Sequence, residues 1–189
     1  EINDATPVMQ WNNKFIVLPS QQGLMLVHQH RAHVGVIYKE LLKQLHEHKG
    51  LTQTLLFPEI IELSNQDIVT LQTMIDDLQY LGFGLDQFSP NSYSITAVPV
   101  LLGQTNPVET LMQVIHQVQD MGGTAQQHWQ ETMALTLADR MAIPTGKALS
   151  TIEMRDLLIQ LAEKHPAQYL TNGQTIITIL TPDEIQKRF

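Results

Sequence analysis

Hydrophobic positions recur along the chain with two different periods. Short runs of β-branched and large apolar residues predict strands, and longer stretches with apolar residues three or four positions apart predict amphipathic helices. The predicted strands are residues 14–18, 24–27, 52–63, 84–88, 92–100 and 175–180. The predicted helices are residues 29–48, 64–81, 107–121 and 127–141, with further helices that begin after Ser150 and Thr181.

Polar residues at the ends of these stretches predict where helices begin and end. Ser64 and Ser150 are each followed three residues later by an acidic residue, which predicts two capping boxes. Gly50 follows the first predicted helix and is suited to its C-terminal cap. Gly122 and Gly123 predict a hinge between two helices.

The order of these elements predicts an α+β fold with two lobes. The strand at 175–180 has no neighbour close in sequence, so we expect it to pair with the hairpin formed by 14–18 and 24–27. Residues 1–50 and 123–189 would then form one lobe, and residues 51–122 would form an inserted lobe.

Composition narrows the class of protein. The chain has 189 residues, of which 43% are hydrophobic, enough for one sizeable core or two small lobes. No apolar run approaches the roughly 18 residues that a membrane-spanning helix needs. Because the sequence starts at Glu1 without methionine, we expect it to be part of a longer protein.

The charge and the absence of cysteine exclude several kinds of site. The formal net charge is −8, and the 11 Lys and Arg residues are scattered rather than clustered. Strong DNA binding by this chain alone is therefore not expected, since phosphate contacts need a basic patch. With no cysteine, disulfides, cysteine nucleophiles and thiolate metal sites are excluded.

Three histidines lie where the second strand of the hairpin runs into the first helix. They are His28, His30 and His33, and the last two share a helix face. Neutral imidazole is a common metal ligand, but no carboxylate lies beside these residues in sequence. We interpret them as helix caps or hydrogen-bonded core groups. Metal binding is the alternative, with Asp139 and His30 as a possible residual pair.

Residues 10–16 (QWNNKFI) and 23–33 (GLMLVHQHRAH) resemble the opening of the C-terminal dimerisation domain of the MutL mismatch-repair family. The order of elements also matches, so the resemblance covers nearly the whole chain. It implies that residues 1–50 with 123–189 form a dimerisation subdomain and that residues 51–122 form an external, regulatory subdomain. It further implies a homodimer that needs no cofactor for this domain.

The chain departs from the metal-binding motif of the nuclease-active branch of that family. That branch reads D-Q-H-A-x-x-E-x-x-x-x-E and uses carboxylates because hard divalent ions prefer charged oxygen ligands. The corresponding residues here are His28, Gln29, His30, Val34 and Lys39, and a second element carries Asp139 in place of cysteine. The resemblance therefore implies a branch without endonuclease activity. The alternative is a metal-dependent DNA endonuclease with an altered, histidine-containing site.

The string Gln53-Thr-Leu-Leu-Phe-Pro58 resembles the motif by which MutL proteins contact the replicative sliding clamp. Its apolar anchors would be Leu55, Leu56 and Phe57, with the Gln53 amide and Pro58 fixing the extended peptide. The other interpretation is an edge strand whose leucines face the core. Both hold if some residues of the strand are buried and others bind.

The family also implies partners that lie outside this chain. A full-length protein would carry an ATP-binding ATPase domain, contact a mismatch-recognition protein and DNA, and work in the bacterial cytoplasm at the nucleoid, without membrane contact. A small-molecule regulatory domain of α+β type is a further alternative. Candidates for the self-association surface are residues 176–179, the helix from Met133 to Met141, and Phe189.

Overall fold

The computed structural model describes residues 6–121 and 126–189, which fold into two compact units. The first unit is Glu1–Lys39 with Ala142–Phe189, and the second unit is Glu40–Met141. The fold is α+β with two antiparallel sheets, as predicted. These divisions differ from those expected at residues 50 and 122, because helix α1 contributes to both units and α4 packs with the helices of the second unit. The predicted glycine hinge lies outside the described residues.

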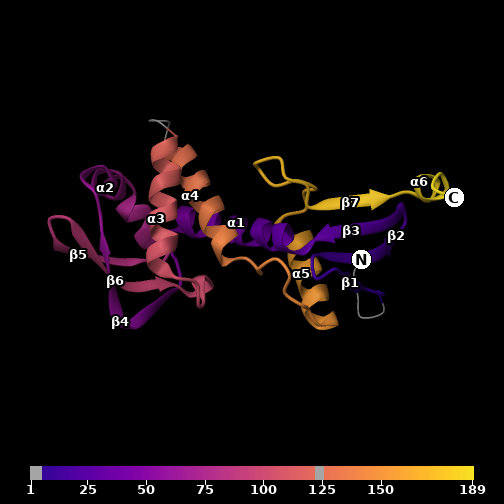
Figure 1. Ribbon diagram of the computed structural model, residues 1–189, viewed down its shortest axis with the longest axis horizontal. Helices are drawn as coiled ribbons and strands as arrows, with labels where there is room; N and C mark the ends of the chain where they lie inside the picture. The colour runs from indigo at the N-terminus through magenta and orange to yellow at the C-terminus, as the bar shows by residue number, and fades with distance from the viewer. Residues whose placement is uncertain (1–5, 122–125) are drawn as a thin grey trace. The chain divides into compact units, whose positions relative to one another are not determined.

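The first unit is built on a four-stranded sheet in the order β1-β2-β3-β7, with each neighbouring pair antiparallel (Figure 1). Its strands are β1 (Met9–Trp11), β2 (Phe15–Ser20), β3 (Gly23–His28) and β7 (Ile177–Leu180). The expected pairing of the C-terminal strand with the hairpin is thus confirmed. The short strand β1 was not predicted.

One face of this sheet is covered by helices. The helices of the unit are the start of α1 (Gln29–Glu47), α5 (Thr151–Lys164) and the short α6 (Pro182–Gln186). Ile16, Leu18 and Val27 are at most 4% exposed, so their side of the sheet is the core side. Helix α5 begins with the predicted capping box of Ser150 and Glu153 and buries its leucines.

The second unit packs helices on a three-stranded sheet in the order β4-β6-β5. Its elements are β4 (Thr52–Glu62), α2 (Asn65–Tyr80), β5 (Gly84–Ser89), β6 (Ser92–Pro99), the 3-10 turn η1 (Val100–Leu102), α3 (Pro107–Asp120) and α4 (Gln126–Met141). The predicted capping box joins Ser64 and Asp67 at the start of α2. Asp67 also accepts a hydrogen bond from Gln119 at 2.8 Å, which connects α2 to the end of α3.

Among the described residues, no helix combines the length and the apolar character that crossing a bilayer requires.

Candidate functional sites

His28 ends strand β3 and caps helix α1. Its ring is 8% exposed, packs edge-on against Phe15 with 5.3 Å between ring centroids, and accepts a long hydrogen bond of 3.4 Å from the Arg31 N–H at Nδ1. Burial lowers the pKa of His28 to about 4, and the positive charges of Arg31 and Lys14 add to this effect. The ring is therefore neutral at physiological pH and serves the helix N-terminus.

His30 and His33 both bind the backbone of one residue, Ile143. The Nδ1 atom of His30 lies 2.8 Å from the Ile143 carbonyl oxygen, while Nδ1 of His33 accepts from the Ile143 N–H at 2.9 Å. Burial lowers the pKa of His33 to about 4, with His30 and Lys147 adding to the effect and Asp156 opposing it. One nitrogen of each ring thus holds the segment that follows α4 against α1.

Gln29 is fully buried in a network of amides. Its Nε2 donates to the carbonyl oxygens of Asn13 and Lys147, both at 2.9 Å, and its Oε1 accepts from Gln10 at 2.6 Å. Gln10 in turn accepts from the Leu149 N–H at 3.1 Å. The network ties β1 and the turn after it to residues 147–149. Gln10 belongs to the stretch of residues 10–16 that resembles the family, but its role in this hydrogen-bond network was not predicted.

The other residues of the degenerate motif do not complete a metal site. Val34 is a fully buried core residue, Lys39 is exposed on α1, and Asp139 is exposed on α4 in the second unit. Across residues 6–121 and 126–189, no group of three or more His, Asp or Glu side chains is arranged to hold a metal ion. The histidine corner is thus a hydrogen-bonded and apolar structure in which Gln29 and Val34 occupy the interior.

The string from Gln53 to Pro58 begins in the ladder of the second sheet and leaves it after Thr54. Strand β4 pairs with β6 through Thr54 opposite Ala97 and again from Glu59 opposite Ile95, so four residues of β4 face a single residue of β6. The register shift pushes residues 55–58 outward as a bulge. We call residues 55–58 the β4 bulge.

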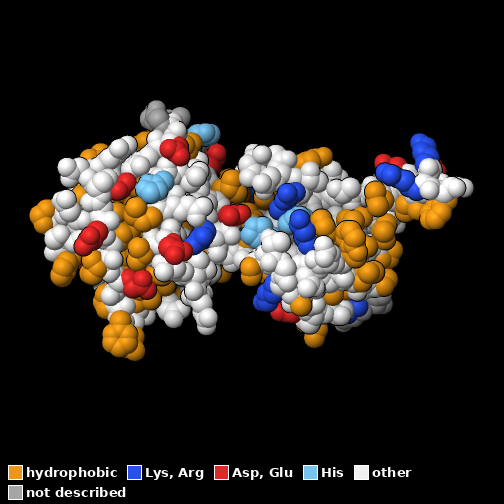
Figure 2. Space-filling model, in the orientation of Figure 1, with side chains coloured by type: hydrophobic (Ala, Val, Ile, Leu, Met, Phe, Trp, Pro, Cys, Tyr) orange, Lys and Arg blue, Asp and Glu red, His pale blue; other side chains and the backbone are white. Residues whose placement is uncertain are grey.

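The β4 bulge exposes two of its apolar side chains. Leu56 is 87% exposed and Phe57 is 79% exposed, while Leu55 is partly buried and Pro58 is exposed. Gln53 precedes the bulge, with its backbone paired to Val98 and its side chain exposed. Apolar side chains project from the β4 end of the second unit in Figure 2. The bulge thus presents an extended peptide rather than a strand whose leucines all face the core.

The second exposed apolar feature is the uncovered face of the first unit's sheet. Residues paired directly across antiparallel strands point to the same side, and the pairings Trp11–Phe15, Val17–Leu26 and Leu24–Leu180 all lie opposite the core side. We call this surface the open face. Its apolar residues are Met9, Trp11, Phe15, Val17, Pro19, Leu24, Leu26 and Leu180, of which Val17 is only 9% exposed. His28 and Thr178 lie on the same side. Apolar side chains gather over β2, β3 and β7 in Figure 2.

The uncovered face of the second unit's sheet has a different composition. Ile60 and Asp86 flank Ser94 across that sheet, and Glu62 pairs with Ser92 on the same side. Of these five residues of the second sheet only Ile60 is apolar, although Phe88 of β5 is also 72% exposed. The apolar open face of the first unit is therefore a feature of that unit, and not a general consequence of short strands.

The candidates that the sequence analysis named for self-association lie in different places. Residues 176–179 overlap β7 of the first unit's sheet, where Thr178 lies opposite Leu26 on the open face. Ile177 and Ile179 lie on the core side of β7, and Met133 and Met141 are buried in the second unit. Phe189 is fully exposed. The open face was missed because its residues come from four strands whose register the sequence does not give. The signal that could have indicated it is the alternation of apolar residues on both faces of β2 and β3.

Known proteins resemble this chain over most of its length. A family model described as the MutL C terminal dimerisation domain matches residues 8–149. A DNA mismatch repair protein MutL from Bacteroides fragilis is 34% identical over all of this chain and 30% of its own length. The MutL protein from Phocaeicola vulgatus is 31% identical over 95% of this chain and 29% of its own length. The one from Chlorobium chlorochromatii is 30% identical over 96% of this chain and 28% of its own length.

These matches cover enough of the chain to assign it to a family. The chain spans only about 30% of the length of the curated relatives it matches. Within that span the match runs through the hairpin, the histidine corner, the β4 bulge and the second unit. The chain belongs to the family of MutL C-terminal dimerisation domains.

Proposed function

We propose that this chain is the homodimerisation module of a DNA mismatch repair MutL protein, and that the open face of the first unit makes the symmetric contact. The observation that carries the proposal is the uncovered apolar sheet. Trp11 and Met9 are each 55% exposed there, and Leu24 and Leu180 are each 37% exposed. Single apolar residues scattered over a surface are ordinary, whereas a contiguous apolar face of this kind is typical of a binding surface.

A second copy is the occupant that this composition favours. Burying a large apolar side chain stabilises by about 1.5–3 kcal/mol, and a two-fold contact buries each residue of the open face twice. Trp11 and Phe15 stack with 5.7 Å between ring centroids, which gives the face a rigid aromatic anchor. No Asp, Glu, Lys or Arg of β1, β2, β3 or β7 lies on the open face, so the strands themselves bring no charge into the contact. The Lys14 ammonium, from the turn before β2, lies 5.7 Å from the centroid of the Phe15 ring.

Molar mass in solution tests the dimer directly. Light scattering over a concentration series down to low micromolar is expected to give twice 21.4 kDa. A mass of 21.4 kDa at every concentration would contradict the proposed homodimer.

The proposal places this module in a longer protein. Its relatives are about three times as long and are named DNA mismatch repair proteins, so we infer that upstream domains supply ATP binding and that mismatch recognition and DNA contact involve the full-length protein. The second unit carries twelve Asp and Glu against three Lys and Arg, which disfavours phosphate contact by that unit. We place the protein in the bacterial cytoplasm, associated with the nucleoid.

We also propose that the chain has no endonuclease activity. The positions that would hold divalent ions carry a capping histidine, a buried amide, a valine and a lysine, and these do not supply the charged oxygen ligands that such ions prefer. One ring nitrogen of both His30 and His33 is committed to the backbone of Ile143. Nicking of supercoiled plasmid by the pure chain with Mn²⁺ would contradict this part.

The β4 bulge is proposed as the contact with the replicative sliding clamp. Its geometry supports the idea, because Leu56 and Phe57 already point away from the fold and the flanking ladder holds the peptide extended. A partner pocket could therefore receive them with little loss of conformational entropy.

Replacing Gln53 and Leu56 together with alanine is expected to weaken clamp binding at least ~10-fold, because two anchors of roughly 1 kcal/mol or more are lost. Surface plasmon resonance with immobilised clamp measures the affinity. The matched control is Val69→Ala with Gln72→Ala, which removes an exposed apolar and an exposed amide side chain from α2 of the same unit. Equal binding by both variants would reject the site.

A further inference from the structure

The C-terminal helix α6 is a short arm that extends past the end of the first unit's sheet (Figure 1). Thr181 and Glu184 form a capping box at its start, and Pro182 occupies its first turn. No residue of α6 is buried. The arm is thus an ordered element that packs none of its side chains into the core.

The point where the arm leaves the sheet is fixed by Gly23. This residue has a φ of +140°, and a Cβ atom there would lie 2.2 Å from the Leu180 carbonyl oxygen and 3.0 Å from the Thr181 Cα. The turn between β2 and β3 therefore abuts the junction of β7 and α6. Only glycine permits that approach, which holds α6 beside the end of the sheet.

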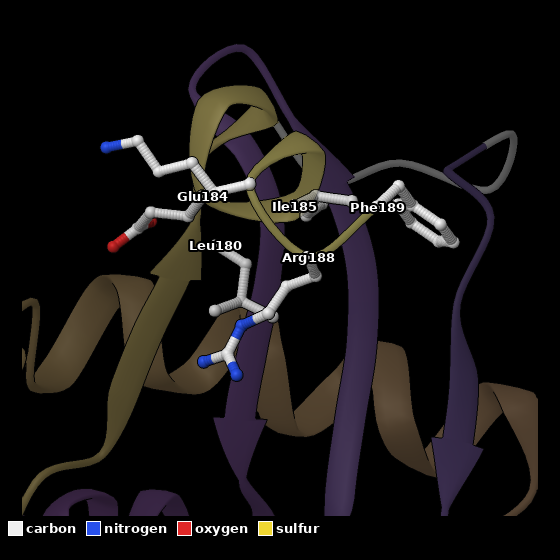
Figure 3. A pocket seen from close by; sticks show the side chains of 6 residues that line it. Leu180, Glu184, Ile185, Arg188 and Phe189 are labelled. Atoms are coloured by element: carbon white, nitrogen blue, oxygen red, sulfur yellow. The ribbon is translucent and has the colours of Figure 1, made fainter.

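A hollow of about 560 Å³ lies beneath the arm. Figure 3 shows Leu180, Ile185 and Phe189 around it, with Glu184 and Arg188 at its rim. Ile185 is 38% exposed and Phe189 is fully exposed. Leu180 belongs both to the hollow and to the open face, where it pairs with Leu24. The hollow therefore adjoins the open face at Leu180, while the charged side chains of Glu184, Lys187 and Arg188 also line it.

The open face is too small to hold a dimer by itself. With strands about 4.8 Å apart and a rise of about 3.3 Å per residue, its flat area is only roughly 300 Å². Stable, specific contacts bury about 800 Å² of accessible surface per partner. Even if the relief of the side chains doubles the flat figure, more surface is needed, and the arm is the apolar surface that continues the face.

The arm also lacks a reason to be helical in isolation. A helix as short as five residues is unstable in water unless it packs against something. Its capping box accounts for the start of the helix, and Ile185 is partly covered, but Phe189 is fully exposed and gains no burial from folding. A second copy that covers the open face would supply the missing contact.

We propose that α6 and the hollow beneath it form part of the dimer contact, with apolar side chains of the second copy filling the hollow against Ile185 and Phe189. This inference rests on the proposed homodimer and assigns to it a surface beyond the sheet. The α6 arm of each copy then contacts the other copy beside the end of the first unit's sheet. Residues 150–189 lie beyond the part of the chain that the family model matches.

The test compares dimer dissociation constants by sedimentation equilibrium of the whole chain. Ile185→Ser with Phe189→Ser is expected to raise the constant at least tenfold. Far-UV circular dichroism of the variant is expected to match that of the wild-type chain, because no residue of α6 is buried, while the melting temperature of the dimer falls with its weaker association. The control is Ile152→Ser, which removes an exposed apolar residue (78%) from α5. It is expected to change the constant less than twofold.

A second readout follows the arm itself. The chain has no cysteine, so Phe189→Cys carries a single environment-sensitive dye. Its emission is expected to shift with concentration at the midpoint of dimer formation, whereas the same dye at Ile152→Cys is expected to show no shift.

The outcomes separate the two proposals. A wild-type dimer whose dissociation constant the arm substitutions leave unchanged, with no shift of the dye, would overturn the arm contact and leave the open face standing. A wild-type chain that stays monomeric would overturn the proposed homodimer and the arm contact together.

Discussion

Replacing Leu26 with glutamate is expected to convert the dimeric chain into a monomer of 21.4 kDa. Leu26 lies on β3, the strand between β2 and β7, and points from the middle of the open face. In the separated chain a carboxylate there stays hydrated, because no helix covers that side. In the dimer it would be buried without a partner, at a cost of several kcal/mol.

The effect is large because the contact is symmetric. Each dimer would bury two such carboxylates, one from each copy, in the proposed symmetric contact. A total cost above ~4 kcal/mol raises the dissociation constant more than ~1000-fold. Light scattering at micromolar concentration would then report a monomer, and thermal unfolding would show that the monomer is folded.

Ile60→Glu is the matched control for this substitution. Ile60 is 45% exposed and lies on the uncovered face of the other sheet, beside Ser94. The same change of an apolar side chain to a carboxylate is expected to leave the dimer intact. A Leu26→Glu variant that remains dimeric, or an Ile60→Glu variant that dissociates, would show that the dimer contact does not lie on the open face.

The open face shows where sequence reasoning stops. Alternation of apolar residues identified β2 and β3, but β1 was missed because it has only three residues. The sequence did carry a signal for β1, because the pair Asn12-Asn13 is typical of a tight turn between two strands. In the structure these residues have φ values of +53° and +47° and form that turn. Without β1 and its register, Met9 and Trp11 could not be placed beside Val17 and Phe15.

The β4 bulge shows a second limit. Residues Gln53 to Pro58 resemble a clamp-binding motif, but an apolar run of this kind predicts an ordinary strand equally well. What exposes Leu56 and Phe57 is the register shift between Thr54 and Glu59. That shift depends on the pairing of β4 with β6, about 40 residues away in sequence, which local patterns do not determine.

The histidine corner was interpreted correctly in kind and incompletely in detail. A cap or a hydrogen-bonded core group was expected, and His28 and His33 have these environments. The partner Ile143 could not be foreseen, because it lies more than 100 residues from His30 and His33 along the chain. Local sequence predicts that a buried imidazole needs a partner, and only the fold identifies it.

Acid is expected to destabilise the first unit between pH 6.5 and about 4 through two buried histidines. The pKa values of His28 and His33 are lowered from 6.5 to about 4 in the folded chain, with burial as the main cause. As pH falls below about 6.5 the unfolded chain binds protons that the folded chain does not. The free energy of unfolding therefore decreases between pH 6.5 and about 4, and is fully retained only above that window.

The size of this effect follows from the two shifts. Each pKa unit corresponds to about 1.4 kcal/mol, so each histidine removes roughly 3 kcal/mol by pH 4. Near pH 5 the two together give a slope of roughly 2.7 kcal/mol per pH unit. Since a domain is typically stable by about 5–15 kcal/mol, this loss is sufficient to unfold the unit. Urea titrations at pH 7.5, 6.5, 5.5 and 4.5 measure the slope.

A double substitution separates the histidines from other acid effects. Asparagine at position 28 can still cap α1, and glutamine at position 33 can still accept a hydrogen bond, but neither titrates. His28→Asn with His33→Gln is therefore expected to flatten the dependence between pH 6.5 and 4.5, whatever it does to stability at pH 7.5. Burial raises the pKa of Asp67, but hydrogen bonds from Ser64 and Gln119 outweigh burial and lower it overall, so its contribution is lost only at more acidic pH. An unchanged slope in the double variant would show that the two rings are not the groups that acid protonates.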